Sequence, residues 1–327
     1  MREAVFVRQH QARWHRYETQ VPAGPEELAS RFIELTDDLA YARTFYPDST
    51  TTAYLNTLTG KLHQALYKNK TEESGRLLRF WRLELPLLVV RHRRPLLLSL
   101  LLFLLSCGLG ALSASLDDTF VRVILGDGYV NQTLANIEKG DPMAVYKREG
   151  ETLMFLQITL NNVKVSLYAF VGGITGGLFT AFMLFRNGVM LGAFQLFFFQ
   201  KQVGLQSVLT IWIHGTLEIS AIVLAGGAGL VMGQGLLFPG TYSRRDALRR
   251  SARDGMQLVL GLVPMFVVAG FLEGFVTRHT EMPLAASLLI IGGSAAWVLG
   301  YFVVYPWWLY RQGTHLLPHS SATLVRE

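Results

Sequence analysis

Apolar residues form long runs in the second two-thirds of the chain, whereas in the first third they recur singly among polar residues. The first long run covers residues 95–115 and contains no charged side chain over 21 residues. A helix rises 1.5 Å per residue, so about 20 apolar residues cross a hydrocarbon core about 30 Å thick. The pattern therefore predicts an all-α, polytopic membrane protein.

Later apolar runs predict further spans, which together give about six transmembrane segments within residues 95–310. The later spans cover about residues 165–185, 189–199, 207–238, 256–276 and 284–305. The second span ends at Arg186-Asn187-Gly188, a sequence typical of a turn, so Asn187 and Gly188 are expected to form one. The third run is short, so residues 189–202 form either a short helical span or a re-entrant segment.

Residues 1–94 are expected to form a separate helical bundle. Apolar side chains recur at helical spacing in three segments, divided by proline-containing turn sequences at residues 22–25 and 46–49. The predicted core positions are Phe6, Trp14, Tyr17, Leu28, Phe32, Leu35, Leu39, Ala42, Tyr46, Leu55, Leu58, Leu62 and Leu66. These side chains form the core of the bundle or, in part, a docking face for a partner helix.

Charge sets the expected orientation in the membrane. The basic cluster at residues 91–94 precedes the first span, and a second cluster occupies the loop at about residues 240–254. Cytoplasmic loops are rich in Lys and Arg, so both clusters, both termini and the tail at 311–327 are expected in the cytoplasm. The loop at about 117–151 holds seven acids and four bases and is expected outside.

The basic loop is a candidate lipid-binding segment. Ser243 and Asp246 have the spacing of a capping box, which predicts a short basic helix on the membrane surface. Its lipid-facing residues are Arg244, Arg245, Arg249, Arg250 and Arg253. Because the net charge of +6 arises beside the spans, it does not indicate nucleic acid as a partner.

Three ionisable residues fall inside the predicted spans: His214, Glu218 and Glu273. Each is costly in hydrocarbon, and His214 and Glu218 share a helix face at i and i+4. The predicted topology places all three in the outer half of the membrane. Asn161, Asn162 and Lys164 enter the second span at the same depth. This polar cluster is either a structural hydrogen-bond network or the lining of a cavity for an ion, a proton or a lipid head group.

The motifs of several enzyme classes are absent from the sequence. It contains no G-x-S-x-G elbow, Walker A loop or dinucleotide fingerprint. One His and two carboxylates lack the second His of an H-E-x-x-H zinc site, and the single cysteine, Cys107, excludes an intrachain disulfide. We therefore expect no enzyme activity, no metal site and no cofactor.

Several motifs together resemble the stage II sporulation protein M family. In the membrane region they are Asn161-Asn162, Arg186-Asn187-Gly188-Val-Met-Leu-Gly192, His214-Gly215-Thr-Leu-Glu218-Ile-Ser-Ala221 and Glu273-Gly-Phe-Val-Thr277. In the first third they are Trp14, Asp38-Leu39-Ala40-Tyr41-Ala42-Arg43, Tyr46-Pro47 and Tyr54-Leu55-Asn56. The large N-terminal bundle is similar to that of the longer, non-sporulation bacterial members.

The resemblance implies a multi-pass protein of the bacterial inner membrane, with membrane lipids around it. It also implies, as partners, MoxR-type AAA+ ATPases and von Willebrand factor A-like proteins, and it is compatible with a homo-oligomer. Two functional hypotheses follow. The first is a scaffold or accessory subunit of an envelope-associated complex, and the alternative is a transporter or channel-like protein that uses the polar cluster.

Overall fold

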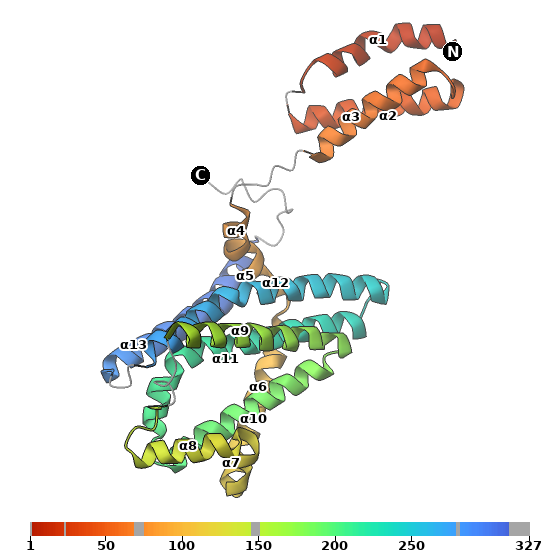
Figure 1. The fold of residues 1–327 in the computed structure, drawn as a ribbon. Helices are drawn as coiled ribbons and strands as arrows, with labels where there is room; N and C mark the ends of the chain where they lie inside the picture. Colours follow the sequence, from red (N-terminus) through yellow and green to blue (C-terminus); the bar gives the residue numbers. More distant parts are fainter. Residues whose placement is uncertain (1, 23, 69–74, 145–150, 279–281, 314–327) are drawn as a thin grey trace. The chain divides into compact units, whose positions relative to one another are not determined.

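The computed structural model describes residues 2–22, 24–68, 75–144, 151–278 and 282–313, and every regular element among them is a helix (Figure 1). The chain divides into two compact units, residues 1–76 and 77–327. Five helices among the described residues are long and apolar enough to cross a membrane. The chain is therefore an all-α polytopic membrane protein, as the hydrophobic pattern predicts.

The N-terminal unit is a three-helix bundle of α1 (Glu3–Thr19), α2 (Pro25–Phe45) and α3 (Thr50–Lys68). Its buried core consists of Phe6, Trp14, Leu35, Leu39, Ala42, Leu55, Leu58 and Leu62. These are all predicted core positions, and Tyr17, Leu28, Phe32 and Tyr46 pack against them. Leu66, also predicted, is only partly buried and lies outside this cluster. One apolar stripe per helix is thus enough to close the bundle.

The boundary between the units corrects the expectation of a 1–94 domain. The segment after Arg76 comprises α4 (Arg76–Arg79), a π-helical turn η1 (Phe80–Glu84) and α5 (Leu85–Arg91). Leu85, Leu88 and Val89 are buried in the core of the membrane unit. The Trp81 indole donates to the carbonyl of Gly261, 3.3 Å away. The apolar side chains of η1 and α5 thus pack in the second unit, so this segment belongs there.

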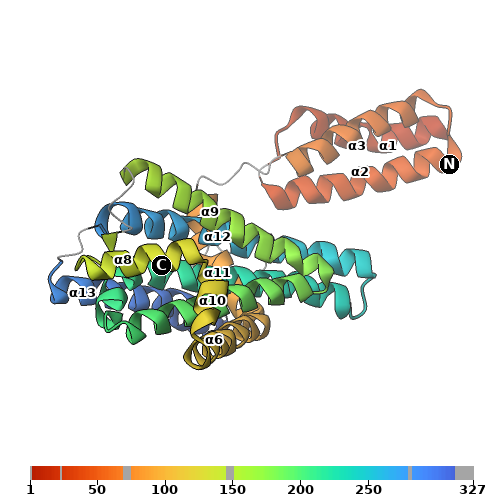
Figure 2. The ribbon, with the colours of Figure 1, turned by 60° about the horizontal axis from the view of Figure 1, so that its bottom comes forward.

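The membrane unit has its first span in α6 (Arg93–Leu116), as predicted, and four further candidate spans. These are α10 (Leu178–Gln200), α11 (Gly204–Leu237), α12 (Arg244–Phe271) with η4 (Leu272–Val276), and α13 (Leu284–Leu299) with η5 (Gly300–Val304) and α14 (Tyr305–Arg311). A sixth long helix, α9 (Glu151–Val171), packs along α11 and α12 (Figures 1 and 2). It is not among the five candidate spans.

The predicted second span, 165–185, is wrong in its bounds. A 3-10 turn, η3 (Gly172–Thr175), and two left-handed glycines, Gly176 (φ 71°) and Gly177 (φ 89°), separate α9 from α10. Left-handed backbone is readily available to glycine, so the chain reverses here. A Cβ on Gly173 would overlap the Gly229 carbonyl of α11, so close helix contact also requires glycine.

The turn predicted at Asn187 and Gly188 is therefore wrong as well. Both residues lie inside α10, and residues 189–200 form its second half, followed by a turn at 201–202. Gly188 faces α6, where an added Cβ would be 2.6 Å from the Ser106 Cβ. The glycine serves helix packing, and residues 189–202 form no separate short span or re-entrant segment.

The long helices run alternately between two ends of the unit. At one end, called the Leu237 end, Gly176 lies against the Leu237 side chain. At the other, called the Gly204 end, the Gln200 side chain donates to the Ala114 carbonyl, 3.3 Å away. Two short helices follow α6 at this end, α7 (Asp118–Leu125) and α8 (Asp127–Glu138) (Figure 1). The predicted polar loop at 117–151 is thus largely helical, except for residues 145–150, which lie outside the described residues.

The basic segment does not form a short helix of its own. Residues 244–253 are the first turns of α12, which continues without a break to Phe271. The predicted cap is present, because the Ser243 hydroxyl accepts a hydrogen bond from the Asp246 amide at 3.2 Å. The five arginines are exposed, and Arg250 lies over the Tyr242 ring at 4.1 Å. Most of the predicted tail, residues 314–327, is outside the described residues.

Candidate functional site

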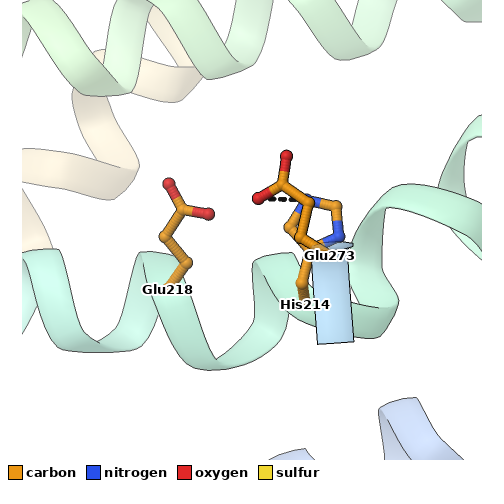
Figure 3. Close-up of side chains that lie close together, drawn as sticks. All are labelled: His214, Glu218 and Glu273. Atoms are coloured by element: carbon orange, nitrogen blue, oxygen red, sulfur yellow. Dashed lines mark ion pairs between the residues drawn. The ribbon is translucent and has the colours of Figure 1, made fainter. Parts of the chain in front are cut away.

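His214, Glu218 and Glu273, the three ionisable residues inside the predicted spans, lie together in the membrane unit (Figure 3). His214 and Glu218 project from α11, and Glu273 projects from η4. One nitrogen or oxygen atom from each residue lies within 4.8 Å of those of the other two. His214 Nε2 lies 3.7 Å from Glu273 Oε2. We call these three residues the ionisable cluster.

Local helix geometry explains this arrangement. His214 and Glu218 are one helical turn apart, so they share a face of α11. The end of α12 widens into a π-turn, in which the Thr277 amide donates to the Leu272 carbonyl at 2.8 Å. Single π-turns change the direction of side chains and recur at functional sites. In this π-turn Glu273 points toward His214.

A second contact sets the orientation of the His214 ring. Its Nδ1 lies 3.0 Å from the Thr277 hydroxyl, which donates its proton to the Leu272 carbonyl at 3.1 Å. Because that hydroxyl has one proton, the hydrogen-bond network assigns Nδ1 as the donor to Thr277. A neutral His214 then carries its lone pair on Nε2, the nitrogen nearest Glu273.

The ionisable cluster lines a cavity of about 640 Å³, which is open rather than enclosed. Its polar lining also includes Gln157, Asn161 and Asn162 of α9, Asn187 of α10 and Tyr129 of α8. Apolar side chains from α6, α7, α9, α10 and α11 form most of the rest of the wall. A cavity of this size, with few convergent polar groups among apolar ones, is typical of a small-ligand site.

Two polar side chains of the wall, Asn162 and Tyr129, are fully or partly buried. The buried Nδ2 of Asn162 faces the Glu218 carboxylate from beyond regular hydrogen-bond distance. Tyr129, outside the spans, is partly buried, and desolvation raises its pKa to about 12. Its phenol therefore stays neutral and can donate a hydrogen bond into the cavity.

The structure separates the remaining predicted residues from this site. Lys164 does not line the cavity; it is exposed on α9, with its Nζ 5.7 Å from the centroid of the Tyr168 ring. Gly188 packs against α6. The five arginines of α12 begin at the Leu237 end, whereas His214 is about 15 Å along α11 from Gly204 at 1.5 Å per residue. They form a separate exposed group.

Sequence reasoning missed three contributors to the site. Asn187 was assigned to a turn, although a continuous helix through residues 178–200 brings its side chain to the cavity. Thr277 ends the motif that begins at Glu273, and that spacing was the available signal for a partner of His214. Gln157 precedes Asn161 by one helical turn, so helical periodicity would have placed it on the same face of α9.

Comparison with known families agrees with the division into two units. The model of the family described as "Stage II sporulation protein M" matches residues 99–278, more than half of the chain. A second model, described as "Domain of unknown function (DUF8413)", matches residues 4–68, which are the three helices of the N-terminal unit. No curated protein and no solved structure matches the chain.

Proposed function

The chain belongs to the stage II sporulation protein M family, and on that premise we propose that its membrane unit binds a small hydrophilic solute as a transporter or channel-like protein. The observation that carries this proposal is the opening of the ionisable cluster onto a cavity of about 640 Å³. A purely structural network would be filled by neighbouring side chains, because protein interiors are close-packed. Ionisable groups inside membrane segments commonly mark solute or proton pathways.

The wall of the cavity indicates where a solute enters. Ile124 and Tyr129, from the short helices α7 and α8, line it together with the cluster. The site is therefore nearest the Gly204 end, which we place on the outer side of a bacterial inner membrane because the arginine-rich segment lies at the opposite end. Both termini are then cytoplasmic.

Access of water to the cavity tests this function directly. In a Cys107→Ser background, Asn161→Cys should react with a membrane-impermeant thiol reagent added from the outer side. Leu289→Cys, an exposed position on α13 that does not line the cavity, is the matched control and should react poorly. Equal, negligible labelling at both positions would mean a dry cavity, and the transport proposal would fail.

A second candidate function, a scaffold for an envelope-associated complex, is supported by the separate N-terminal unit. Its surface carries large apolar side chains, including Ile33, 61% exposed, and Phe45, 56% exposed. Exposed apolar groups of this kind are suited to contacts with a partner. The partner classes implied by the family resemblance are MoxR-type AAA+ ATPases and von Willebrand factor A-like proteins.

Purification of the intact protein from membranes, beside a form lacking residues 1–76, tests the scaffold. The deletion ends at the unit boundary, so the fold of the membrane unit is preserved. We expect the ATPase to co-purify with the intact chain alone, and Ile33→Asp with Phe45→Ser to reduce its recovery. Recovery that does not depend on residues 1–76 would exclude this unit as the docking element.

A further inference from the structure

We propose that His214, Glu218 and Glu273 bind a divalent transition-metal ion, with an open coordination position facing the cavity. This inference rests on the proposed solute-binding function and names the class of ion that the cavity would take. It differs from the expectation drawn from sequence, in which one His and two carboxylates were too few to indicate a metal site. The tertiary structure adds the orientation of the three side chains.

The contact between His214 and Glu273 is the first argument. The Thr277 hydroxyl accepts the Nδ1 proton, so the lone pair of Nε2 is directed toward the Glu273 carboxylate. Two acceptors facing each other repel unless a proton or a cation lies between them. Their separation of 3.7 Å is longer than a hydrogen bond, which is about 2.7–3.2 Å for nitrogen and oxygen.

The same separation suits two ligands of one metal ion. Zinc lies about 2.0–2.2 Å from His nitrogen and carboxylate oxygen in tetrahedral sites, which places neighbouring ligands roughly 3.3–3.5 Å apart. The observed 3.7 Å is close to that spacing. Glu218 is the more distant member, since the three ligand atoms span up to 4.8 Å. A rotamer adjustment of its flexible side chain would complete a three-ligand site.

The residues around the three ligands also resemble the surroundings of a metal centre. Metal-bound His commonly donates its other ring nitrogen to an oxygen acceptor, and Thr277 is that acceptor here. Asn162 supplies an independent observation, because its buried Nδ2 lines the cavity and faces the Glu218 carboxylate from beyond regular hydrogen-bond distance. It could donate to a metal-bound water or to a carboxylate ligand.

Charge and ligand type narrow the class of ion. Two carboxylates and a neutral imidazole carry a charge of −2, so a divalent ion would leave the buried site without net charge. Calcium and magnesium prefer ligand sets made of oxygen, whereas imidazole with carboxylate suits zinc, manganese or iron. Three protein ligands leave a fourth position open, as in sites that exchange water or substrate.

Metal binding by the full-length protein in detergent provides the test. After treatment with a chelator, the protein is dialysed against Zn²⁺, and the bound metal is counted by mass spectrometry. We expect one ion per chain that is lost in Glu218→Gln and Glu273→Gln, with at least a tenfold weaker affinity in each. Glu138→Gln, an exposed acid outside the cavity, is the control and should bind as the unchanged protein does.

Cobalt(II) gives a second readout that needs no variant. Co²⁺ bound in a tetrahedral site of His and carboxylate ligands has visible absorption bands that Co²⁺ in water lacks. Absence of those bands, or zinc binding that is the same in Glu218→Gln and Glu273→Gln, would overturn the metal site. Thiol labelling at Asn161→Cys separates the two proposals. A labelled cavity without metal leaves solute binding intact, whereas an unlabelled cavity defeats the proposed function itself.

Discussion

His92 and Asp254, 162 positions apart in the sequence, are joined by a 2.9 Å contact between His92 Nε2 and Asp254 Oδ2. His92 immediately precedes α6, and Asp254 lies in the first half of α12, so the contact links the start of one long helix to the body of another. Arg91 also approaches the same carboxylate, with its Nη1 3.6 Å from Oδ2. Asp254 therefore connects α12 to the start of α6, although these two helices are not consecutive in the chain.

Replacement of Asp254 should destabilise the membrane unit. Hydrogen bonds to charged groups contribute about 1.5–3 kcal/mol, and Asp254→Asn would remove the charge that both His92 and Arg91 approach. We expect a lower midpoint of thermal unfolding in detergent, whereas Glu138→Gln, an exposed change, should leave it unaltered. An unchanged midpoint in Asp254→Asn would show that this contact does not hold the helices.

Close packing of α6 against α10 predicts a sharp contrast between two glycines. A Cβ at Gly192 would overlap the Cys107 carbonyl of α6, whereas a Cβ at Gly108 meets nothing within 4 Å. Overpacking of this kind costs about 1–3 kcal/mol. Gly192→Ala should therefore lower the unfolding midpoint, and Gly108→Ala should not. Similar midpoints for the two variants would contradict this packing.

Orientation in the membrane can be measured by labelling single cysteines in a Cys107→Ser background. Positions Asp127 and Gly204 should react with an impermeant reagent from outside, because they lie at the Gly204 end. Positions Gly75 and Arg249, and the C-terminus, should react only from the cytoplasmic side. The prediction depends on the arginine bias, and external labelling at Arg249 would reverse the assigned sides.

Lipid selectivity of the α12 arginines is a further expectation. Each basic residue near an anionic surface contributes about 1 kcal/mol of attraction. Replacing Arg244, Arg245, Arg249, Arg250 and Arg253 by Gln should reduce the anionic phospholipid that co-purifies with the protein, as measured by native mass spectrometry. Arg122→Gln, at the opposite end, is the control. If the content of anionic lipid does not change with the five substitutions, or with salt concentration, its attraction to α12 is not electrostatic.

The N-terminal unit should depend on one buried carboxylate. Asp38 accepts hydrogen bonds from the Trp14 indole at 2.7 Å and from Arg13 at 2.6 Å. Asp38→Ala would leave these donors without that acceptor, at a cost of about 1–3 kcal/mol. Urea unfolding of residues 1–76, which form a compact unit, should show this loss, while the exposed neighbour Asp37→Ala stays near the unchanged protein. If the two variants unfold at the same urea concentration, Asp38 does not stabilise the N-terminal unit in this way.

Hydrophobic pattern predicted most of the fold, because burial in lipid or in a bundle core imposes a periodicity that is visible in one dimension. Residues 95–115 and the core positions of the N-terminal unit are examples. The pattern failed between residues 165 and 200, where two helices and their turn are all mainly apolar. Hydropathy does not distinguish a glycine-rich turn such as Gly176-Gly177 from the interior of a span, since the backbone angle that ends the helix has no hydropathy signal.

The sequence by itself determined the membrane class, the number of long helices in broad terms, and the identity of the costly polar residues, because each of these depends on local composition. Only the tertiary structure decided that Leu85 belongs to the membrane unit and that Asn187 lines the cavity while Lys164 does not. It also decided the direction of the His214 lone pair, through Thr277. These properties depend on which helices meet and at what angle, and contacts between distant residues determine both.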